Sequence, residues 1–307
     1  MKTSSDDSSG ALPIEARSFL GASSALVDHA LNELVPAETT QPLNVHRAIR
    51  WSLFAGGKRF RPALVFAVGG VFGANVDDLM KTACALEMVH TYSLIHDDLP
   101  SMDDDELRRG RPTCHVQFNE AIAILAGDAL QTLAFQAIAD DEKLTPAIRL
   151  QVLGELARAA GTPLGMVAGQ ASDLDAESRE VTGADLEIIH RLKTGALICA
   201  AARTGAIIAG ASVDQLDAVT SYAAYLGLLF QITDDLLDVT ASAEALGKTP
   251  GKDVRSRKAT YPSLYGLEST RERAREAYEK ACESLDRIEH PADLLRSIAE
   301  YILERRM

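Results

Sequence analysis

The sequence has few cysteines, few aromatic residues and no long uninterrupted apolar stretch. Its four cysteines are far apart and form no C-x-x-C pair: Cys84, Cys114, Cys199 and Cys282. This spacing argues against a disulfide framework or a structural zinc site and suits a reducing compartment. No uncharged apolar run reaches about 18 residues, the length that predicts a membrane-spanning helix. We therefore expect a cytoplasmic protein without a membrane span.

Positive charge is also scarce. The 307 residues include 31 Lys and Arg against 44 Asp and Glu, which gives a formal net charge of −13. Such a surface repels phosphate backbones, so binding to nucleic acid or to an anionic membrane is not expected. A phosphorylated ligand would need local clusters of Lys and Arg or bridging cations.

Strand-like alternation is nearly absent, and aromatic residues make up only 5% of the chain. Ala, Leu, Glu and Arg instead recur at steps of three and four residues, which predicts helices. Thr145 and Pro146 are typical of a helix start and Gly161 of a helix end. The Ala-rich segment 196–210 would let helices approach closely. We predict an all-α, single-domain bundle over residues 13–307, after a polar leader at 1–12 that lacks the apolar region of a signal peptide.

Residues 97–106, DDLPSMDDDE, form the first of two acidic clusters and directly follow an apolar helical segment. On an unbroken helix, six steps of about 100° would leave Asp97 and Asp103 on different faces. Pro100 disfavours helical geometry at Leu99, so we predict a break that can bring Asp103 back beside Asp97. Taken alone, this run could also be a solvated loop.

The second acidic cluster is FQITDDLLD, residues 230–238. Asp234 and Asp238 are four apart on one helix face, which Gln231 shares. Taken alone, this cluster could be an exposed acidic stripe. Together, two carboxylate pairs facing one another across a bundle would suit Mg²⁺, which prefers carboxylates, phosphate oxygens and water. Such ions would let an acidic protein hold a diphosphate.

Basic residues gather at specific places despite the negative balance. The GGKRFRP segment at 56–62 puts two of them on one helix face, and others follow the acidic run or stand alone: Lys58, Arg61, Arg108, Arg109, Lys193, Lys248 and Lys258. Arg can hold a phosphate through two hydrogen bonds, and Lys serves as a mobile charge. We interpret Arg59, Arg111, Lys252 and most of the charged run 271–280 as ordinary surface charges. His90 lies nearly in line with Asp97, either as a site residue or as a hydrogen-bonded core histidine.

The order of these motifs resembles a known family. GGKRFRP, EMVHTYSLIHDDLPSMDDDELRRGRPT, GQASDLDAE, IHRLKTGALI, FQITDDLLD, LGKTPGKD and KATYP follow one another between about residues 40 and 265. The sequence is similar to the all-α short-chain isoprenyl diphosphate synthases, most of all to the bacterial farnesyl diphosphate synthase type. The resemblance implies a bundle of long helices around a deep central cavity, a homodimer, and three Mg²⁺ ions with substrate bound.

The resemblance also implies residue roles. Asp97 and Asp103, supported by Asp98, and Asp234, completed by Asp235 and Asp238, would hold the metal ions. Contacts to the allylic diphosphate would come from Arg108, Lys193, Lys248 and Lys258. Isopentenyl diphosphate would be bound by Lys58, Arg61, His90 and Arg109. Thr194 and Gln231 would lie beside the breaking C–O bond and the cationic carbon.

Tyr92 bears on the length of the product. It precedes Asp97 by five residues, about 7.5 Å along a helix, and in the resembling family an aromatic residue there goes with a C15 product. The neighbouring Ser93 is small and adds nothing to such a block. Tyr92 could also be an ordinary core residue.

We therefore expect a prenyltransferase that makes farnesyl diphosphate from isopentenyl diphosphate and dimethylallyl or geranyl diphosphate, or in a close variant geranylgeranyl diphosphate. A class I terpene cyclase is disfavoured because it needs no isopentenyl pocket and would carry an N-D-x-x-S-x-x-x-E motif. A non-catalytic partner subunit is disfavoured because both acidic motifs are intact.

Overall fold

A computed structural model describes residues 14–240 and 259–305. Apart from one short hairpin, this part of the chain is built from helices, which confirms the all-α prediction. The elements are α1 (Ile14–Leu34), α2 (Leu43–Leu53), α3 (Phe60–Val71), α4 (Val76–Asp97), β1 (Leu107–Arg108), β2 (Arg111–Pro112), α5 (Cys114–Gln117), α6 (Glu120–Ala139), α7 (Pro146–Ala160), α8 (Met166–Ala176), α9 (Gly183–His190), the π-helical turn η1 (Arg191–Gly195), α10 (Ala196–Ile208), α11 (Val213–Thr240), α14 (Tyr261–Tyr265), α15 (Leu267–Leu285) and α16 (Asp293–Leu303).

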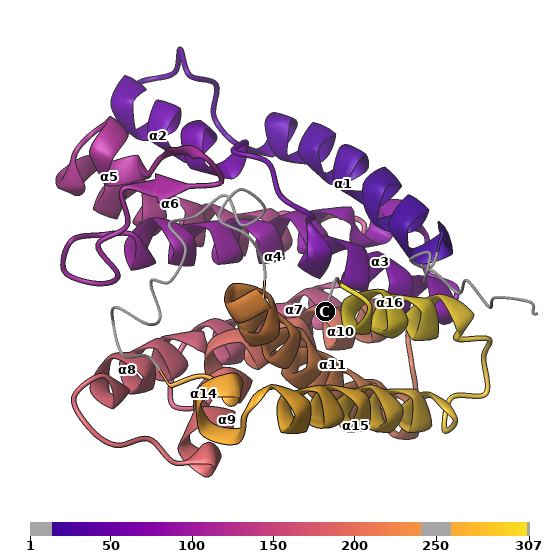
Figure 1. The fold of residues 1–307 in the computed structure, drawn as a ribbon. Helices are drawn as coiled ribbons and strands as arrows, with labels where there is room; N and C mark the ends of the chain where they lie inside the picture. Colours follow the sequence, from indigo (N-terminus) through magenta and orange to yellow (C-terminus); the bar gives the residue numbers. More distant parts are fainter. Residues whose placement is uncertain (1–13, 241–258, 306–307) are drawn as a thin grey trace, which may run out of the picture.

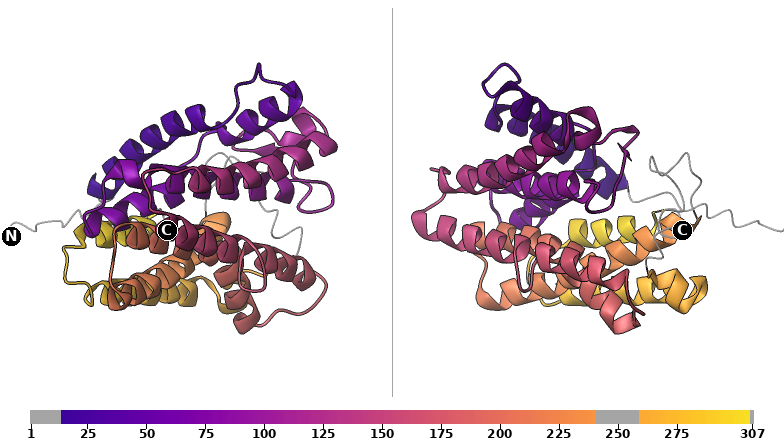
Figure 2. Two further views of the ribbon diagram at one scale, coloured as in Figure 1. Left: turned by 180° about the vertical axis from the view of Figure 1, so that it is seen from behind. Right: turned by 90° about the vertical axis from the view of Figure 1, so that its left-hand side faces the viewer.

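The helices lie in two stacked layers (Figure 1). Helices α1–α6 form the upper layer of that view, and α8, α9, α11, α14 and α15 form the lower one. The same division is seen from behind and from the side (Figure 2). Helix α10 packs against α3 of the upper layer and against α7 and α11. The first acidic motif therefore ends a helix of one layer, and the second motif lies on a helix of the other.

Local sequence signals explain several helix ends. Thr145 caps α7, because its hydroxyl accepts the backbone N–H of Ile148 at 3.3 Å, and Pro146 is the first helical residue. Gly161 ends the same helix. Both ends agree with the sequence-based prediction.

The small side chains of α10 allow the close approach that the sequence predicted. Ala201, Ala202 and Ala206 are fully buried. A Cβ atom on Gly205 would lie 2.5 Å from the backbone oxygen of Val65 in α3. The two helix backbones therefore touch at this position.

Replacing Gly205 with alanine should destabilise the fold by about 1–3 kcal/mol, because two helix backbones must separate to admit the methyl group. Gly70 of α3 offers a matched control, since a Cβ there meets nothing within 4 Å. Gly70→Ala should be neutral or stabilise by up to about 1 kcal/mol through helix propensity. Urea denaturation of the two variants measures the difference. Equal unfolding free energies for the two would contradict the proposed close packing.

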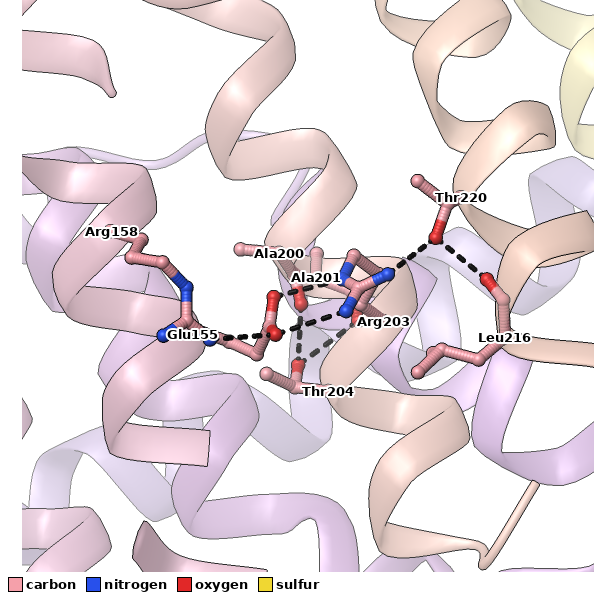
Figure 3. Close-up of polar contacts among 8 residues, drawn as sticks. All are labelled: Glu155, Arg158, Ala200, Ala201, Arg203, Thr204, Leu216 and Thr220. Carbon is pink, nitrogen blue, oxygen red and sulfur yellow. Dashed lines mark hydrogen bonds and ion pairs between the residues drawn. The ribbon is translucent and has the colours of Figure 1, made fainter. Parts of the chain in front are cut away.

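A half-buried polar cluster joins three helices on the α7 side of α10 (Figure 3). The Arg203 guanidinium donates to both carboxylate oxygens of Glu155, at 2.8 and 3.0 Å, and to the Thr220 hydroxyl at 2.6 Å. Arg158 also donates to Glu155, at 2.9 Å. The cluster ties α10 to α7 and α11.

Within the described part of the chain, α6 is the one helix long and apolar enough to cross a membrane by length and composition. It packs along α4 and α2, with Ala123, Ala126 and Leu130 fully buried. The core helix of a soluble protein passes the same test. The apolarity of α6 is therefore no evidence by itself for a membrane span.

Candidate active site

The first acidic motif folds back on itself after α4 ends at Asp97. The backbone N–H of Asp103 donates to the backbone oxygen of Asp97 at 2.8 Å, across the turn at Pro100. This confirms the predicted break and the return of Asp103 to Asp97. Burial, with the Asp103 carboxylate nearby, raises the pKa of Asp97 to about 6, against the opposing charge of Lys193. A cation at this turn would relieve the unfavourable placement of negative charge.

Asp98 points into the protein and pairs with Arg108 of β1. The Arg108 Nε donates to the two Asp98 oxygens at 2.9 and 2.8 Å, and Asp98 is only 3% exposed. The ion pair therefore fixes the β1–β2 hairpin beside the end of α4. A metal-binding role for Asp98 stays a prediction, because the contact that the structure shows for its carboxylate is with Arg108.

On α11 the acidic residues of the second motif have different surroundings. Asp234 is 41% exposed at its side chain and accepts from Arg305, beyond α16, at 2.9 Å. Asp235 is buried, accepting from the Gln231 amide at 3.0 Å and from the backbone N–H of Tyr261 at 2.9 Å. The partners of Asp235 are thus protein donors that join α11 to α14.

Lys193 and Thr194 lie on the π-helical turn η1 between α9 and α10. Such wide turns occur often at functional sites. The Thr194 hydroxyl donates to the Gln231 Oε1 at 2.9 Å, so the two residues that sequence reasoning assigned to the reacting carbon are in contact. Lys193 donates to Asp173 of α8 at 2.7 Å.

Two residues of α8 belong to this neighbourhood although sequence reasoning gave them no role. Asp173 pairs with Lys193, and both amide atoms of the buried Gln170 lack a hydrogen-bond partner among the described residues. Gly169 lets α8 approach, since a Cβ there would lie 2.2 Å from the Lys193 backbone nitrogen. The GQASDLDAE segment could have pointed to these residues from the sequence, because it contains Gly169, Gln170 and Asp173.

Electrostatic interactions connect the two layers at the site. Asp97 of α4 interacts with Lys193 of η1, and Asp234 of α11 interacts with Lys58 and Arg61 at the start of α3. Each acidic motif therefore interacts with basic residues on another part of the bundle. Across residues 14–240 and 259–305, no group of three or more His, Cys, Asp and Glu side chains is placed to hold a metal ion by itself. Carboxylate pairs without further ligands fit Mg²⁺, which completes its shell with water and phosphate oxygens.

Three of the four residues that the resemblance assigns to isopentenyl diphosphate interact on the α3–α4 side, since His90 interacts with Arg61 and Arg109. The fourth, Lys58, interacts with Arg305 and Asp234. The Arg109 guanidinium lies over Gly57, where a Cβ would be 2.6 Å from its Nη1. Burial, together with the charges of Arg61 and Arg109, lowers the pKa of His90 well below 6.5. His90 is therefore neutral at neutral pH. Lys248, Lys252 and Lys258 lie outside the described residues.

The surface interpretation of Arg59 is wrong. Its side chain is 1% exposed and pairs with Glu87 at 2.8 Å and with Asp28 at 2.7 Å. Arg111 is half-buried and stacks over Trp51, with its Cζ 3.9 Å from the ring centroid. Neither residue is an ordinary surface cation.

Tyr92 lies on a different face of α4 from Asp97 and contacts the α6 side of the helix. Its ring is 6% exposed and packs edge-on against His96, 5.8 Å between centroids. His96 in turn rests on Gly127 of α6 and contacts the Ile124 carbonyl at 3.1 Å. Ser93 donates to the His90 backbone oxygen at 2.8 Å. Tyr92 thus belongs to the α4–α6 packing.

The neutral state of His90 has a consequence for stability. The unfolded chain takes up a proton on this residue below pH 6.5, and the folded chain does not. The free energy of unfolding should therefore fall as the pH drops below 6.5, by up to about 1.4 kcal/mol for each pH unit. We expect His90→Gln to flatten this dependence, measured by urea denaturation between about pH 5 and 7. The exposed His29→Gln variant should follow the wild-type curve, and a His90→Gln curve that also does so would disprove the assignment.

Comparison with known proteins gives a consistent result. The sequence profile of the polyprenyl synthetase family matches residues 44–295. The chain is 46% identical to the farnesyl diphosphate synthase of Escherichia coli, over 91% of this chain and 95% of that protein. It is also 46% identical to the large subunit 1 of a chloroplastic heterodimeric geranylgeranyl pyrophosphate synthase from Arabidopsis thaliana, over 87% of this chain and 73% of that protein. The crystal structure of an FPP/GFPP synthase from Zymomonas mobilis matches with a TM-score of 0.84 and 37% identity, covering 95% of this chain and all of that one.

Proposed function

The chain belongs to the polyprenyl synthetase family, and from this premise we propose that it is a prenyltransferase of the farnesyl diphosphate synthase type. It condenses dimethylallyl or geranyl diphosphate with isopentenyl diphosphate, head to tail, to give the C15 product. The observation that carries this conclusion is the 46% identity to a bacterial farnesyl diphosphate synthase over 91% of the chain. A C20 product is the second candidate, because a geranylgeranyl pyrophosphate synthase subunit is equally identical over 87% of the chain.

The family is generally magnesium-dependent, and the two acidic motifs supply the hard oxygen ligands that this ion requires. We assign Asp97, Asp103 and Asp234 as the principal ligands of three ions, with Asp98 and Asp238 in support. Asp235 and Asp98 are the weakest members of this set, because the Asp235 carboxylate already accepts from Gln231 and Tyr261 and the Asp98 carboxylate from Arg108. Bound magnesium would neutralise charge on the allylic diphosphate and make it a better leaving group.

The allylic diphosphate would lie between the two motifs, with Arg108, Lys193, Lys248 and Lys258 as cationic contacts. Isopentenyl diphosphate would be held by the cluster of Lys58, Arg61, His90 and Arg109. Since His90 is neutral, it would serve this substrate as a hydrogen-bonding group and not as a charge. The two substrates would thereby be held side by side, which converts their encounter into an intramolecular step.

The reaction follows from these charges. The allylic C–O bond breaks, and its electron pair leaves with the diphosphate. The oxygens of Thr194 and Gln231 would stabilise the positive charge on the allylic carbon. The alkene of isopentenyl diphosphate then attacks this carbon, a C–C bond forms, and a proton passes to the departed diphosphate. The scheme requires no side-chain nucleophile.

A product assay tests the proposal. Labelled isopentenyl diphosphate is supplied with Mg²⁺ and a C5, C10 or C15 allylic partner, and the products are separated by chain length. Elongation of the C5 and C10 partners to C15 is expected. Failure to elongate any allylic partner would refute the assignment of the protein as a prenyltransferase. Cyclic hydrocarbons formed from one allylic substrate would indicate a terpene cyclase, and activity only with an added homologue would indicate a regulatory subunit.

We further propose that a second copy of the chain covers the outer face of α6. Ile124 and Leu125 are 45% and 50% exposed there, and the helices α5 and α7, which pack on α6, carry the exposed Val116 and Leu150. The helix carries no Lys or Arg. An apolar face of this kind can pack on itself about a two-fold axis.

Leu125→Lys should convert the dimer to a monomer, because it places two like charges in the proposed apolar contact. Light scattering after size-exclusion chromatography measures the mass. The control is Leu26→Lys on α1, where the leucine is 48% exposed and the helix packs against α3, α4 and α16. A wild-type monomer, or a dimer that survives Leu125→Lys, would contradict the assignment.

One domain over residues 13–307 and a cytoplasmic location stay predictions from the sequence.

A further inference from the structure

The turn before α3 has an unusual backbone held by one buried side chain. Gly56, Gly57 and Arg59 all have positive φ, at 87°, 135° and 45°. Glycine adopts such angles freely, but an L-residue such as arginine does so at a cost. Arg59 is 2% exposed and caps the start of α3 in the left-handed conformation. Contacts of its side chain must offset this cost.

Three acceptors from three helices surround the Arg59 guanidinium. Its Nε donates to Asp28 of α1 at 2.8 Å, its Nη1 to Glu87 of α4 at 2.8 Å, and its Nη2 to the Leu53 carbonyl at the end of α2 at 2.6 Å. The Glu87 side chain is 3% exposed, so this ion pair is shielded from water. Each guanidinium nitrogen is directed at a protein acceptor, which leaves Arg59 poorly placed to bind a substrate.

Every member of the isopentenyl-side basic cluster is attached to this turn or to its partner Glu87. Lys58 precedes Arg59 in the chain, and Arg61 follows it by two residues. The Arg109 guanidinium lies over Gly57. His90 is three residues after Glu87, one turn along the same face of α4. A shift of the turn would therefore move several of these cations relative to one another.

We propose that Arg59, with Glu87 and Asp28, is the positioning device of the isopentenyl diphosphate subsite: it fixes the left-handed turn that sets the geometry of Lys58, Arg61 and Arg109 without touching the substrate. This inference rests on the proposed function, because that function assigns the basic cluster to isopentenyl diphosphate. Lysine would not replace Arg59, since a single ammonium cannot reach acceptors in three directions with the planar geometry of a guanidinium.

The test compares the two substrates in one variant. In Arg59→Met the KM for isopentenyl diphosphate should rise roughly ten- to hundredfold, as expected for a displaced binding group. The KM for geranyl diphosphate should change by less than about twofold, because Asp97, Asp103 and Lys193, which we assign to this substrate and its metal ions, lie outside the turn. Titration calorimetry with isopentenyl diphosphate alone should show the same loss of affinity without catalysis. An equal rise in both KM values, or no rise in either, would overturn the proposal.

Two further variants separate positioning from general stability. Glu87→Gln keeps the volume and one hydrogen bond but removes the charge, and it should show the same one-sided rise in KM even if Arg59→Met folds poorly. The double variant Arg59→Met/Glu87→Met leaves no lone buried charge, so its melting temperature should recover in part. Its KM for isopentenyl diphosphate should stay high. A KM that recovers together with the melting temperature would mean that Arg59 acts only as a structural brace.

Arg203→Met is the matched control, because it breaks a half-buried arginine–carboxylate pair away from the turn (Figure 3). It should lower the melting temperature without changing the ratio of the two KM values. Failure of the positioning role can be distinguished from failure of the proposed function. If the wild-type protein elongates no allylic partner, the proposed function is refuted, whatever the Arg59 variants show. Suppose that the wild-type protein elongates an allylic partner, but Arg59→Met does not raise the KM for isopentenyl diphosphate more than the KM for geranyl diphosphate. That result refutes the positioning role of Arg59 and leaves the proposed function intact.

Discussion

Replacing Asp97 with asparagine should lower kcat/KM for the condensation about a thousandfold, equivalent to about 4 kcal/mol of transition-state stabilisation. The substitution preserves shape and one oxygen but removes the charge that we assign to magnesium binding. Titration of Mg²⁺ in the presence of inorganic pyrophosphate should show a parallel loss of metal affinity. A variant that keeps activity within tenfold of wild type would contradict the assignment.

The same loop provides the control. Asp104 is exposed and has a φ of 50°, a left-handed conformation that asparagine tolerates well. Asp104→Asn should therefore leave activity and Mg²⁺ affinity nearly unchanged, although it also removes one charge from the acidic run. If both variants lost activity equally, the effect would belong to the charge of the run as a whole and not to Asp97.

Asp97→Asn should also stabilise the metal-free protein at neutral pH. The pKa of Asp97 is raised to about 6, so the folded chain binds this proton more tightly than the unfolded chain does. The free energy of unfolding therefore falls as the pH rises through the window between the unfolded and the folded pKa. Asparagine has no charge to bury, so its melting temperature above pH 6 should exceed that of the wild type without metal.

Tyr92→Ala should shift the main product from C15 to C20 or longer. The ring is 6% exposed between α4 and α6, and removing it leaves a void of several carbon atoms beside His96. If the growing chain runs between these helices, it gains room for a further isoprene unit. Product chain length is measured after incubation with labelled isopentenyl diphosphate and geranyl diphosphate.

Tyr92→Phe separates the ring from its hydroxyl. The Tyr92 hydroxyl is buried without a hydrogen bond of normal geometry among the described residues, so its loss should cost little. The phenylalanine variant should still release the C15 product. An unchanged C15 product from Tyr92→Ala would show that another side chain stops the growing chain.

Local signals predicted the helices and the break in the first motif correctly. Pro100 restricts its predecessor, and no distant contact was needed to place the end of α4 near Asp97. The approach of Thr194 to Gln231 came from the family resemblance, because 37 residues separate them and no spacing rule joins such residues.

Arg59 was misjudged for the same physical reason. Its acceptors lie 31 residues before it and 28 after it, so a basic residue beside two glycines looks like part of a surface turn. The departure of Asp235 from the face of Asp234 was predictable, because adjacent helical residues differ by about 100°. The family motif, which groups the three aspartates together, concealed this difference.

The π-helical turn η1 makes a continuous rod of α9 and α10 with one wide turn in its middle. His190 before it contacts Asp235 and stacks on Tyr261, while Thr194 within it contacts Gln231. A π-helical turn closes i→i+5 hydrogen bonds, so it carries one residue more than α-helical winding would need for nearly the same rotation. Deleting a single residue here should therefore restore ordinary winding and leave α9 and α10 nearly in phase. The His190 contacts should survive such a deletion, whereas the contact of Thr194 with Gln231, made from within the turn, should be lost. The fold should therefore tolerate a one-residue deletion here better than the candidate active site does.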